Sequence, residues 1–210
     1  FYDVSGRTIA FSGRIVTPND NAGKYVNTGE TPIFRKGQHI FGLYQAKRAI
    51  AKEGFAYLVE GQFDVITLHK YGVENVIGGS GTAFTDDQVR LIMRFTQSVV
   101  MIYDADDAGM KAAVKNCELL LKAGASVKCI RLPKGYDPDS YGQLCKEETK
   151  KKLSEAIETF PKAMKRMLVP RGCKDEAVIA AAMNTISNLI ACVQDAGLRL
   201  EYMKTMARDF

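Results

Sequence analysis

Six carboxylate side chains lie at or just after the ends of segments that have the composition of β-strands. They are Glu60, Asp64, Asp104, Asp106, Asp137 and Asp139. Parallel strands in an open α/β sheet bring their carboxyl ends to one edge, where ligands collect, so we expect these side chains to converge on one site. So many carboxylates repel one another unless a cation lies among them, and oxygen ligands favour Mg²⁺ or Mn²⁺ over zinc.

The spacing within each acidic motif supports a shared site. Asp64 lies four residues after Glu60, in the first turn of an expected helix, so its carboxylate can turn back toward the sheet edge. Asp104 and Asp106 are two residues apart, and the Asp-Pro-Asp motif at 137–139 repeats that spacing around a proline that stiffens the chain. Two metal ions about 3.5 to 4 Å apart in such a site would stabilise the attacking and leaving oxygens of a phosphoryl displacement.

Each of these motifs also has a structural interpretation. An Asp at the start of a helix commonly caps it, and Asp-Pro-Asp commonly forms a turn. Asp107, next to the pair at 104 and 106, is expected to cap the following helix and not to bind metal. A phosphoacceptor receiver domain also gathers Asp residues and Mg²⁺ at strand ends, so the spacing alone leaves that class open.

The elements that must position these acids alternate between strand and helix from residue 56 onward. The expected strands cover 56–59, 73–77, 98–103 and 126–132. A helix follows each of the first three: one that ends at Tyr71, one that starts with the capping-box pair Thr85 and Gln88, and one at 108–123. This alternation predicts an α/β fold, with a central, mainly parallel sheet flanked by helices on both faces.

The regions on either side of this α/β segment differ from it in composition. Residues 1–55 carry 8 Lys and Arg against 4 Asp and Glu, with an expected strand at 8–17 and an expected helix at 43–52 ahead of Gly54. After 147 the strands stop and helical periodicity continues over about three helices, divided by Pro161, Pro170-Arg171-Gly172 and Gly197. We therefore expect a basic α+β N-terminal subdomain at 1–55, a catalytic domain at 56–146 and a helical subdomain at 147–210.

Composition and charge narrow the class of protein. At 210 residues, with 46% hydrophobic and 25% charged residues, the chain is long and apolar enough to fold, and no apolar run or signal-peptide profile points to a membrane. We expect a soluble, cytoplasmic protein. The five cysteines show no C-x-x-C spacing, which argues against a zinc site or a disulfide framework. A net charge of +5 and a basic N-terminal part suit a polyanionic partner, although ordinary surface charge explains them equally well.

The motifs that carry the acids resemble those of the toprim domain of bacterial DnaG-type replicative primases. They are VEGQFDV (59–65), GSGTAFT (79–85), YDADDAGMKAA (103–113) and LPKGYDPDSY (132–141). Ahead of them, GRTIAFSGRIV, GKYVNTGETPIFRKG and FGLYQAKRAI resemble primase-specific elements, and the last 60 residues are similar to the family's helical subdomain. Toprim motifs also occur in topoisomerases and some nucleases, whereas the KYVNT and IFRKG context is much more specific. One departure is Ala105, where the family usually has Gly.

The resemblance implies an enzyme, a DNA primase, that copies single-stranded DNA into short RNA primers during replication. In that family the first-motif glutamate acts in catalysis and the aspartates bind metal, which assigns catalysis to Glu60, Asp104 and Asp106. All six carboxylates would then hold two or more Mg²⁺ or Mn²⁺ ions. Contacts to template or nucleotide carry over to Arg14, Lys24, Asn27 and Lys36.

The implied partners are a single-stranded DNA template, ribonucleoside triphosphates, the RNA–DNA hybrid product, and a replicative helicase that docks through a region outside this chain. A nucleoid location follows, and no membrane is involved. Because Phe1 and Tyr2 already resemble a strand and no Met precedes them, we expect a fragment with a truncated N-terminal subdomain. The alternatives are a toprim nuclease or topoisomerase module and a non-catalytic, metal-steadied DNA-binding module. Glu60 argues against the last, since a structural metal site needs no general acid or base.

Overall fold

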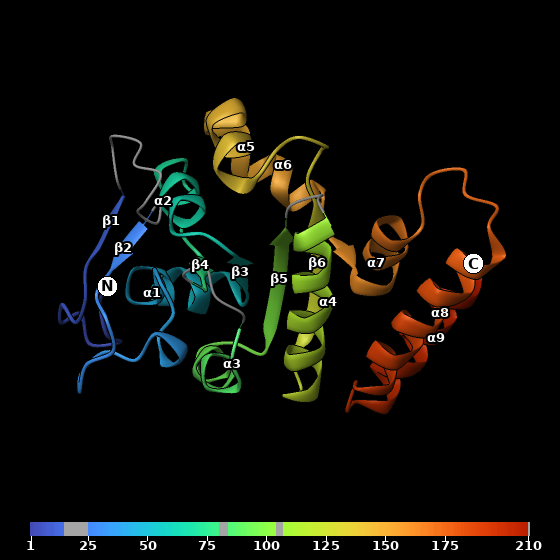
Figure 1. Cartoon of the computed structure of the whole chain (residues 1–210), viewed down its shortest axis with the longest axis horizontal. Helices are drawn as coiled ribbons and strands as arrows, with labels where there is room; N and C mark the ends of the chain where they lie inside the picture. The colour runs from blue at the N-terminus through green and yellow to red at the C-terminus, as the bar shows by residue number, and fades with distance from the viewer. Residues whose placement is uncertain (15–24, 80–83, 104–106, 210) are drawn as a thin grey trace.

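A computed structural model of the chain describes residues 1–14, 25–79, 84–103 and 107–209. At its centre is a five-stranded sheet (Figure 1). In spatial order its strands are β4 (Val76–Gly78), β3 (Ala56–Val59), β5 (Ser98–Tyr103), β6 (Ser126–Arg131) and β7 (Glu158–Thr159). The first four are parallel and β7 is antiparallel to β6, which confirms the predicted mainly parallel α/β sheet.

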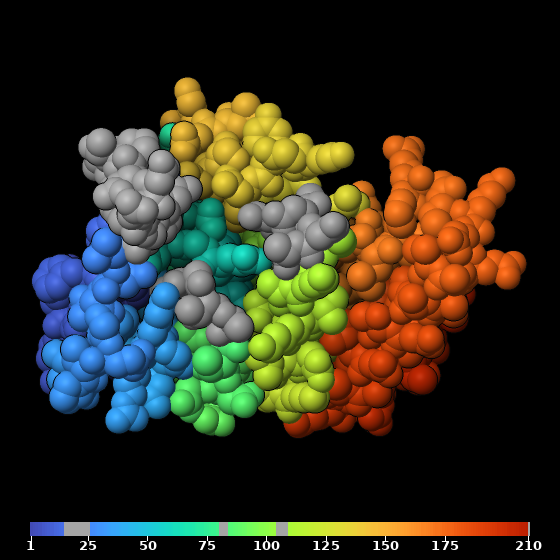
Figure 2. Space-filling model, in the orientation of Figure 1, coloured from blue at the N-terminus to red at the C-terminus, as the bar shows by residue number. Residues whose placement is uncertain are grey.

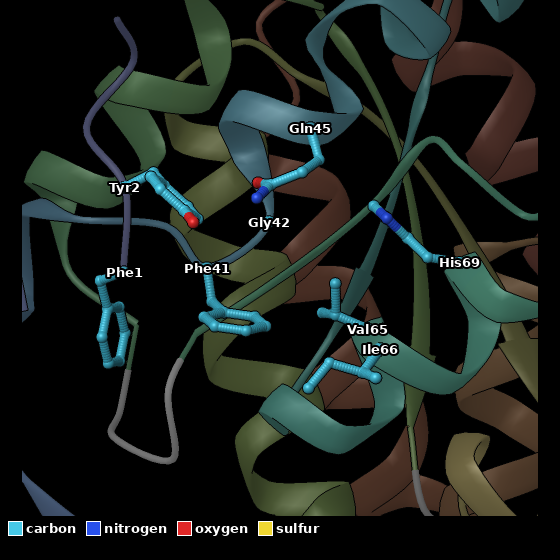
Figure 3. Close-up of a pocket in the computed structure, with 8 residues that line it drawn as sticks. All are labelled: Phe1, Tyr2, Phe41, Gly42, Gln45, Val65, Ile66 and His69. Atoms are coloured by element: carbon cyan, nitrogen blue, oxygen red, sulfur yellow. The ribbon is translucent and has the colours of Figure 1, made fainter. Parts of the chain in front are cut away.

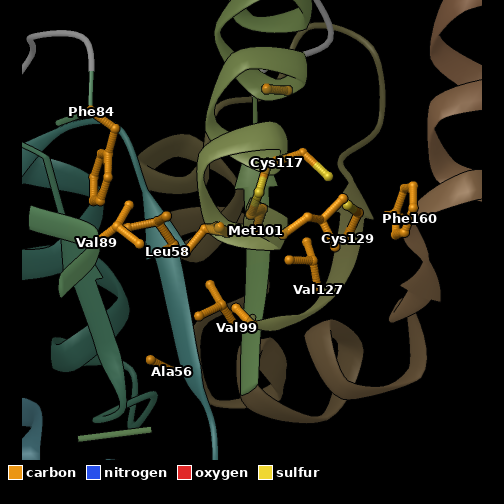
Figure 4. Close-up of a cluster of buried hydrophobic side chains, with 14 of the residues drawn as sticks. Ala56, Leu58, Phe84, Val89, Val99, Met101, Cys117, Val127, Cys129 and Phe160 are labelled. Atoms are coloured by element: carbon orange, nitrogen blue, oxygen red, sulfur yellow. The ribbon is translucent and has the colours of Figure 1, made fainter. Parts of the chain in front are cut away.

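The strands are apolar on both faces, and each face packs against its own set of helices. Along β3, Ala56 and Leu58 belong to one buried cluster (Figure 4), whereas Tyr57 and Val59 belong to another. This alternation follows from the two-residue period of a strand. Burial on both faces explains why the strands read as continuous apolar runs in the sequence.

Helices cover both faces of the sheet. The first cluster takes residues from α1 (Leu43–Glu53), α3 (Asp86–Met93), α4 (Asp107–Lys122), α7 (Phe160–Leu168), α8 (Glu176–Ala191) and α9 (Ala196–Asp209). The second takes residues from α2 (Gln62–Lys70), α5 (Pro138–Cys145) and α6 (Thr149–Glu155). Figure 2 shows α5 in yellow beside α2 in teal on the viewed face. Within the described residues, every helix is too short or too polar to cross a bilayer.

The N-terminal part contains a short hairpin and α1. Strands β1 (Ser12–Arg14) and β2 (Tyr25–Asn27) pair antiparallel, and a 3-10 helix follows at Lys36–Gln38. The predicted helix at 43–52 is confirmed, and Gly54 ends it in the left-handed conformation, with φ of 78°. The predicted strand at 8–17 is shorter than expected, since β1 begins at Ser12 and residues 15–17 lie outside the described part.

The strand predicted at 73–77 is wrong at its start. Gly72 adopts φ of 79°, its N–H donates to His69 O, and the N–H of Val73 donates to Leu68 O. These two bonds form a Schellman motif, in which an apolar residue after the glycine packs back on the helix. Val73 therefore belongs to the end of α2, and β4 starts only at Val76.

The C-terminal part also differs from expectation. Strands do not stop at 147, because the two-residue β7 adds an edge to the sheet, and a segment so short leaves no periodicity in the sequence. Four α-helices lie between residues 149 and 209, after a 3-10 turn at Lys146–Glu148, where about three were expected. Pro161 lies in the first turn of α7 and Gly197 in the first turn of α9, so both mark helix starts.

Candidate metal centre

Three parallel strands bring their carboxyl ends to one edge of the sheet. Leu58 of β3 lies beside Met101 of β5, and Tyr103 of β5 lies beside Arg131 of β6. The arrowhead of β5 points toward the end of the sheet where α5 lies (Figure 1). Glu60 follows β3 directly and is exposed. The segment that leads to α5 follows β6, so the first and last acidic motifs start from this same edge.

Asp64 turns back toward the end of β3, as its place in the first turn of α2 predicts. Its Oδ2 accepts a hydrogen bond from the N–H of Gly61 at 2.8 Å. Its Oδ1 accepts one from the N–H of Asp139 at 3.2 Å. Asp64 and Asp139 are 75 residues apart in the chain, so this bond directly joins the first acidic motif to the last.

The carboxylate of Asp139 is engaged by side chains from two helices. Thr67 Oγ1 of α2 donates to Asp139 Oδ1 at 2.5 Å, and Gln143 Nε2 of α5 donates to the same oxygen at 2.8 Å. Neither Thr67 nor Gln143 was predicted as a site residue. Their spacing held a signal, because Thr67 lies three residues after Asp64 and Gln143 lies four after Asp139, on shared helix faces.

Asp137 is the N-cap of α5. Its Oδ1 accepts a hydrogen bond from the N–H of Ser140 at 2.7 Å, and Pro138 occupies the first turn. This is the structural role that the sequence left open for an Asp before a helix. Capping by one oxygen is compatible with a metal contact through the other.

Three of the predicted site residues lie outside the described residues: Asp104, Asp106 and Lys24. Asp107 is the first residue of α4, one residue before the start expected at 108, and its role as the cap of this helix stays a prediction.

Among the predicted contacts to template or nucleotide, the structure places one beside the acidic motifs. The guanidinium of Arg14 lies over the ring of Phe63, 5.5 Å from its centroid, and so reaches the helix that carries Asp64. Asn27 pairs with Ser12 in the hairpin, and its Oδ1 is buried without a hydrogen-bond partner among the described residues. Lys36 lies against the start of α3, where its carbonyl accepts from Gln88 Nε2 at 3.2 Å.

The chemistry of the donors fits a hard divalent cation. Glu60, Asp64, Asp137 and Asp139 offer only carboxylate oxygens, the ligands that Mg²⁺ and Mn²⁺ prefer. Among the described residues alone, no three His, Cys, Asp or Glu side chains form a ready metal-binding group. The predicted site also includes Asp104 and Asp106, which come after β5 in the sequence and lie outside the described residues.

Two neighbouring features are distinct from this centre. Burial raises the pKa of Tyr103, the residue before Asp104, well above its ordinary value of 10.0, so this phenol stays protonated at neutral pH. An apolar pocket of about 260 Å³ lies beside α2 (Figure 3). The residues that line it, among them Phe41, Val65 and His69, include no carboxylate.

Relatives and solved structures resemble the chain along its length. It is 43% identical over 164 residues to a DNA primase of Aquifex aeolicus, covering 78% of this chain and 33% of the relative. It is 37% identical over 207 residues to a DNA primase of Halalkalibacterium halodurans, covering 98% of this chain and 34% of the relative. The chain therefore spans about a third of the length of these relatives.

Two solved structures share the fold. The zinc-binding and RNA polymerase domains of the Aquifex aeolicus primase superpose with a TM-score of 0.83 at 33% identity, covering all of this chain and 50% of that one. A DnaG primase catalytic domain bound to single-stranded DNA superposes with a TM-score of 0.80 at 29% identity, covering 99% of this chain and 67% of that one.

Two family models match separate parts of the chain. Residues 57–142 match a model described as Toprim-like, and residues 1–47 match the N-terminal domain of the DNA primase catalytic core. With its parallel sheet and the acids at one edge, the protein is of the toprim type. The chain belongs to the DnaG-type DNA primase family. The resemblance drawn from the motifs is thereby confirmed, and the comparisons do not favour the nuclease and topoisomerase alternatives.

Proposed function

We propose that this chain is the catalytic core of a DNA primase, which joins ribonucleotides on a single-stranded DNA template with the help of two or more Mg²⁺ or Mn²⁺ ions. The observation that carries the proposal is the bond from the Asp139 N–H to Asp64. It brings the first and last acidic motifs together beside Glu60 at the strand ends. That arrangement belongs to a chain of the primase family, and it suits in-line phosphoryl transfer.

In this mechanism the carboxylates have two roles. The ions would be held by all six carboxylates: Glu60, Asp64, Asp104, Asp106, Asp137 and Asp139. When bound, the ions supply neutralisation of the triphosphate and a lowered pKa for the attacking 3′-hydroxyl. Glu60 follows β3 directly and is exposed, so it can reach the reacting groups and move a proton as general acid or base.

The basic N-terminal part would hold the template and the incoming nucleotide. The proposed contacts to template and nucleotide are Arg14, Lys24, Asn27 and Lys36. The position of Arg14 over Phe63 supports this role, because it places a cation next to the acidic helix. Phosphate contacts of this kind give affinity without sequence preference.

The proposal extends to organisation and partners. The chain would consist of three parts: a basic subdomain at 1–55, a catalytic domain at 56–146 and a helical subdomain at 147–210. The product would be an RNA–DNA hybrid, the nucleotide substrates would be ribonucleoside triphosphates, and a replicative helicase would dock through another region of the whole protein. We place the protein in the cytoplasm, at the nucleoid.

The test is an RNA synthesis assay. The protein is incubated with single-stranded DNA, the four ribonucleoside triphosphates and Mg²⁺ or Mn²⁺, and the products are resolved by size. We expect short RNA that disappears in Asp104→Ala and persists in Asp175→Ala, because the Asp175 carboxylate caps the first turn of α8. Cleaved DNA would favour a toprim nuclease, and DNA binding without either product would favour a non-catalytic module.

A further inference from the structure

Asp139 is held by two side chains that the proposed mechanism leaves unused. Thr67 and Gln143 both donate to Oδ1, at 2.5 Å and 2.8 Å. Thr67 is only 8% exposed on α2, whereas Gln143 lies exposed on α5, one turn after Asp139. One carboxylate oxygen is therefore fixed from two helices at once.

The backbone of Asp139 is also bonded to α2, through Asp64. Its N–H donates to Asp64 Oδ1, and Asp64 Oδ2 accepts from the N–H of Gly61. Among the described residues, the hydrogen bonds donated to the Asp139 carboxylate go to Oδ1. With Oδ1 and the backbone both held, the direction of Oδ2 is set as well.

The contact between α2 and α5 is close because residue 142 has no side chain. A β-carbon on Gly142 would lie 3.0 Å from Thr67 Cγ2 and 3.4 Å from Leu68 Cδ2. Glycine weakens a helix interior, so its presence in the middle of α5 calls for a packing explanation. The close approach is what brings Thr67 within hydrogen-bond distance of Asp139.

We infer that Thr67 and Gln143 are positioning residues, which hold Oδ1 of Asp139 so that Oδ2 faces the metal ion. The inference rests on the metal-dependent function proposed above. Partners that orient a metal ligand typically change metal affinity by about 10- to 100-fold when they are removed. The competing explanation is that the Thr67 bond only ties α5 to α2, and that the Gln143 bond only steadies the first turns of α5.

The first test measures Mn²⁺ binding to the 210-residue protein by calorimetry, without nucleic acid or nucleotide. Thr67→Val removes the hydroxyl and keeps the shape, and we expect the Kd for Mn²⁺ to rise about tenfold. Thr67→Ser keeps the hydroxyl and should restore the affinity. Gln143→Met, which keeps the length of the side chain, should weaken binding in the same direction.

A double-mutant cycle tests whether Thr67 acts through Asp139. Asp139→Ala alone weakens Mn²⁺ binding, and adding Thr67→Val to it should have no further effect, because coupled residues are not additive. Thr149→Val is the matched control. Its buried hydroxyl donates to Gly142 O of α5 and to Lys146 O, and to no carboxylate among the described residues. This control should lower the unfolding midpoint and leave the Kd for Mn²⁺ unchanged.

The outcomes separate the inference from the proposed function. A Thr67→Val protein that binds Mn²⁺ like the parent overturns the inference, and so does a parent without Asp139-dependent Mn²⁺ binding. If Mn²⁺ binding depends on both Thr67 and Asp139 but the parent protein makes no RNA, the positioning role stands and the primase proposal fails. If RNA is made, excess Mn²⁺ should rescue synthesis in Thr67→Val but not in Asp104→Ala.

Discussion

At the scale of single residues, the two acids of the first motif have different surroundings. Glu60 is exposed after β3, whereas Asp64 accepts two backbone N–H groups. Loss of a general acid or base typically slows a reaction by about 10²- to 10⁴-fold. We expect Glu60→Gln to slow RNA synthesis by that factor in a single-turnover assay. Its free energy of unfolding in urea should change by less than about 0.5 kcal/mol, as for other exposed positions. If the variant lost activity because it had also lost most of its free energy of unfolding, a catalytic role for Glu60 would be contradicted.

His39 makes stability depend on pH. It stacks on Phe34, with ring centroids 5.4 Å apart, and burial lowers its pKa below the ordinary value of 6.5. The unfolded chain therefore binds a proton more readily than the folded chain, so stability is complete above pH 6.5 and falls as the pH drops through the folded pKa. Urea unfolding between pH 8 and pH 5 should show this loss, and His39→Phe should reduce it. Parallel pH profiles would rule His39 out as the cause.

The sequence predicts which acids come together, but not what holds them. Asp64 and Asp139 could be placed at one sheet edge because each follows a strand of a parallel sheet. The partner of Asp139 could not be predicted, because Thr67 lies 72 residues away and contacts it only through the packing of α2 on α5. Hydrogen bonds over such separations depend on tertiary geometry and leave no local pattern.

At the scale of elements, the packing of α5 on α2 depends on Gly142. We expect Gly142→Val to push the helices apart and to cost about 1 to 3 kcal/mol of unfolding free energy, as overpacking does. Thr67→Ala removes the methyl group that the new side chain meets, so the double variant should regain part of the stability in urea. It should not regain Mn²⁺ affinity, because the hydroxyl is gone. Recovery of both would mean that the Thr67 hydroxyl is unimportant.

The accuracy of the predicted elements follows from their length and burial. The strands at 56–59 and 98–103 match β3 and β5, because apolar runs of four to six residues that alternate with helical segments favour buried strands. Val73 misled the prediction because an apolar residue after a helix-ending glycine resembles the start of a strand. The antiparallel β7 was missed because two residues carry no period.

At the scale of the whole molecule, one apolar cluster runs from α1 through the sheet to α9. Phe160 is fully buried in it and contacts Tyr202, with ring centroids 4.6 Å apart. Phe160→Ala should cost about 3 to 5 kcal/mol and still give one cooperative urea transition. Leu200→Ala, which is 52% exposed on α9, should have little effect. Two separate transitions would instead show that the helices after residue 147 unfold on their own.

Charge is also a property of the whole molecule, and its uneven distribution predicts how DNA binding depends on salt concentration. Residues 1–55 contain 8 of the 29 Lys and Arg but only 4 of the 24 Asp and Glu. Each cation that neutralises a phosphate of single-stranded DNA adds about 0.7 to the slope of log affinity against log salt. Lys36→Ala should therefore weaken DNA binding and lower that slope by about 0.7 in fluorescence anisotropy titrations at several KCl concentrations. Lys204→Ala removes an equal charge from the exposed face of α9 and should leave the slope unchanged. If both variants lower the slope equally, DNA responds to the net charge of +5 and not to a defined basic surface.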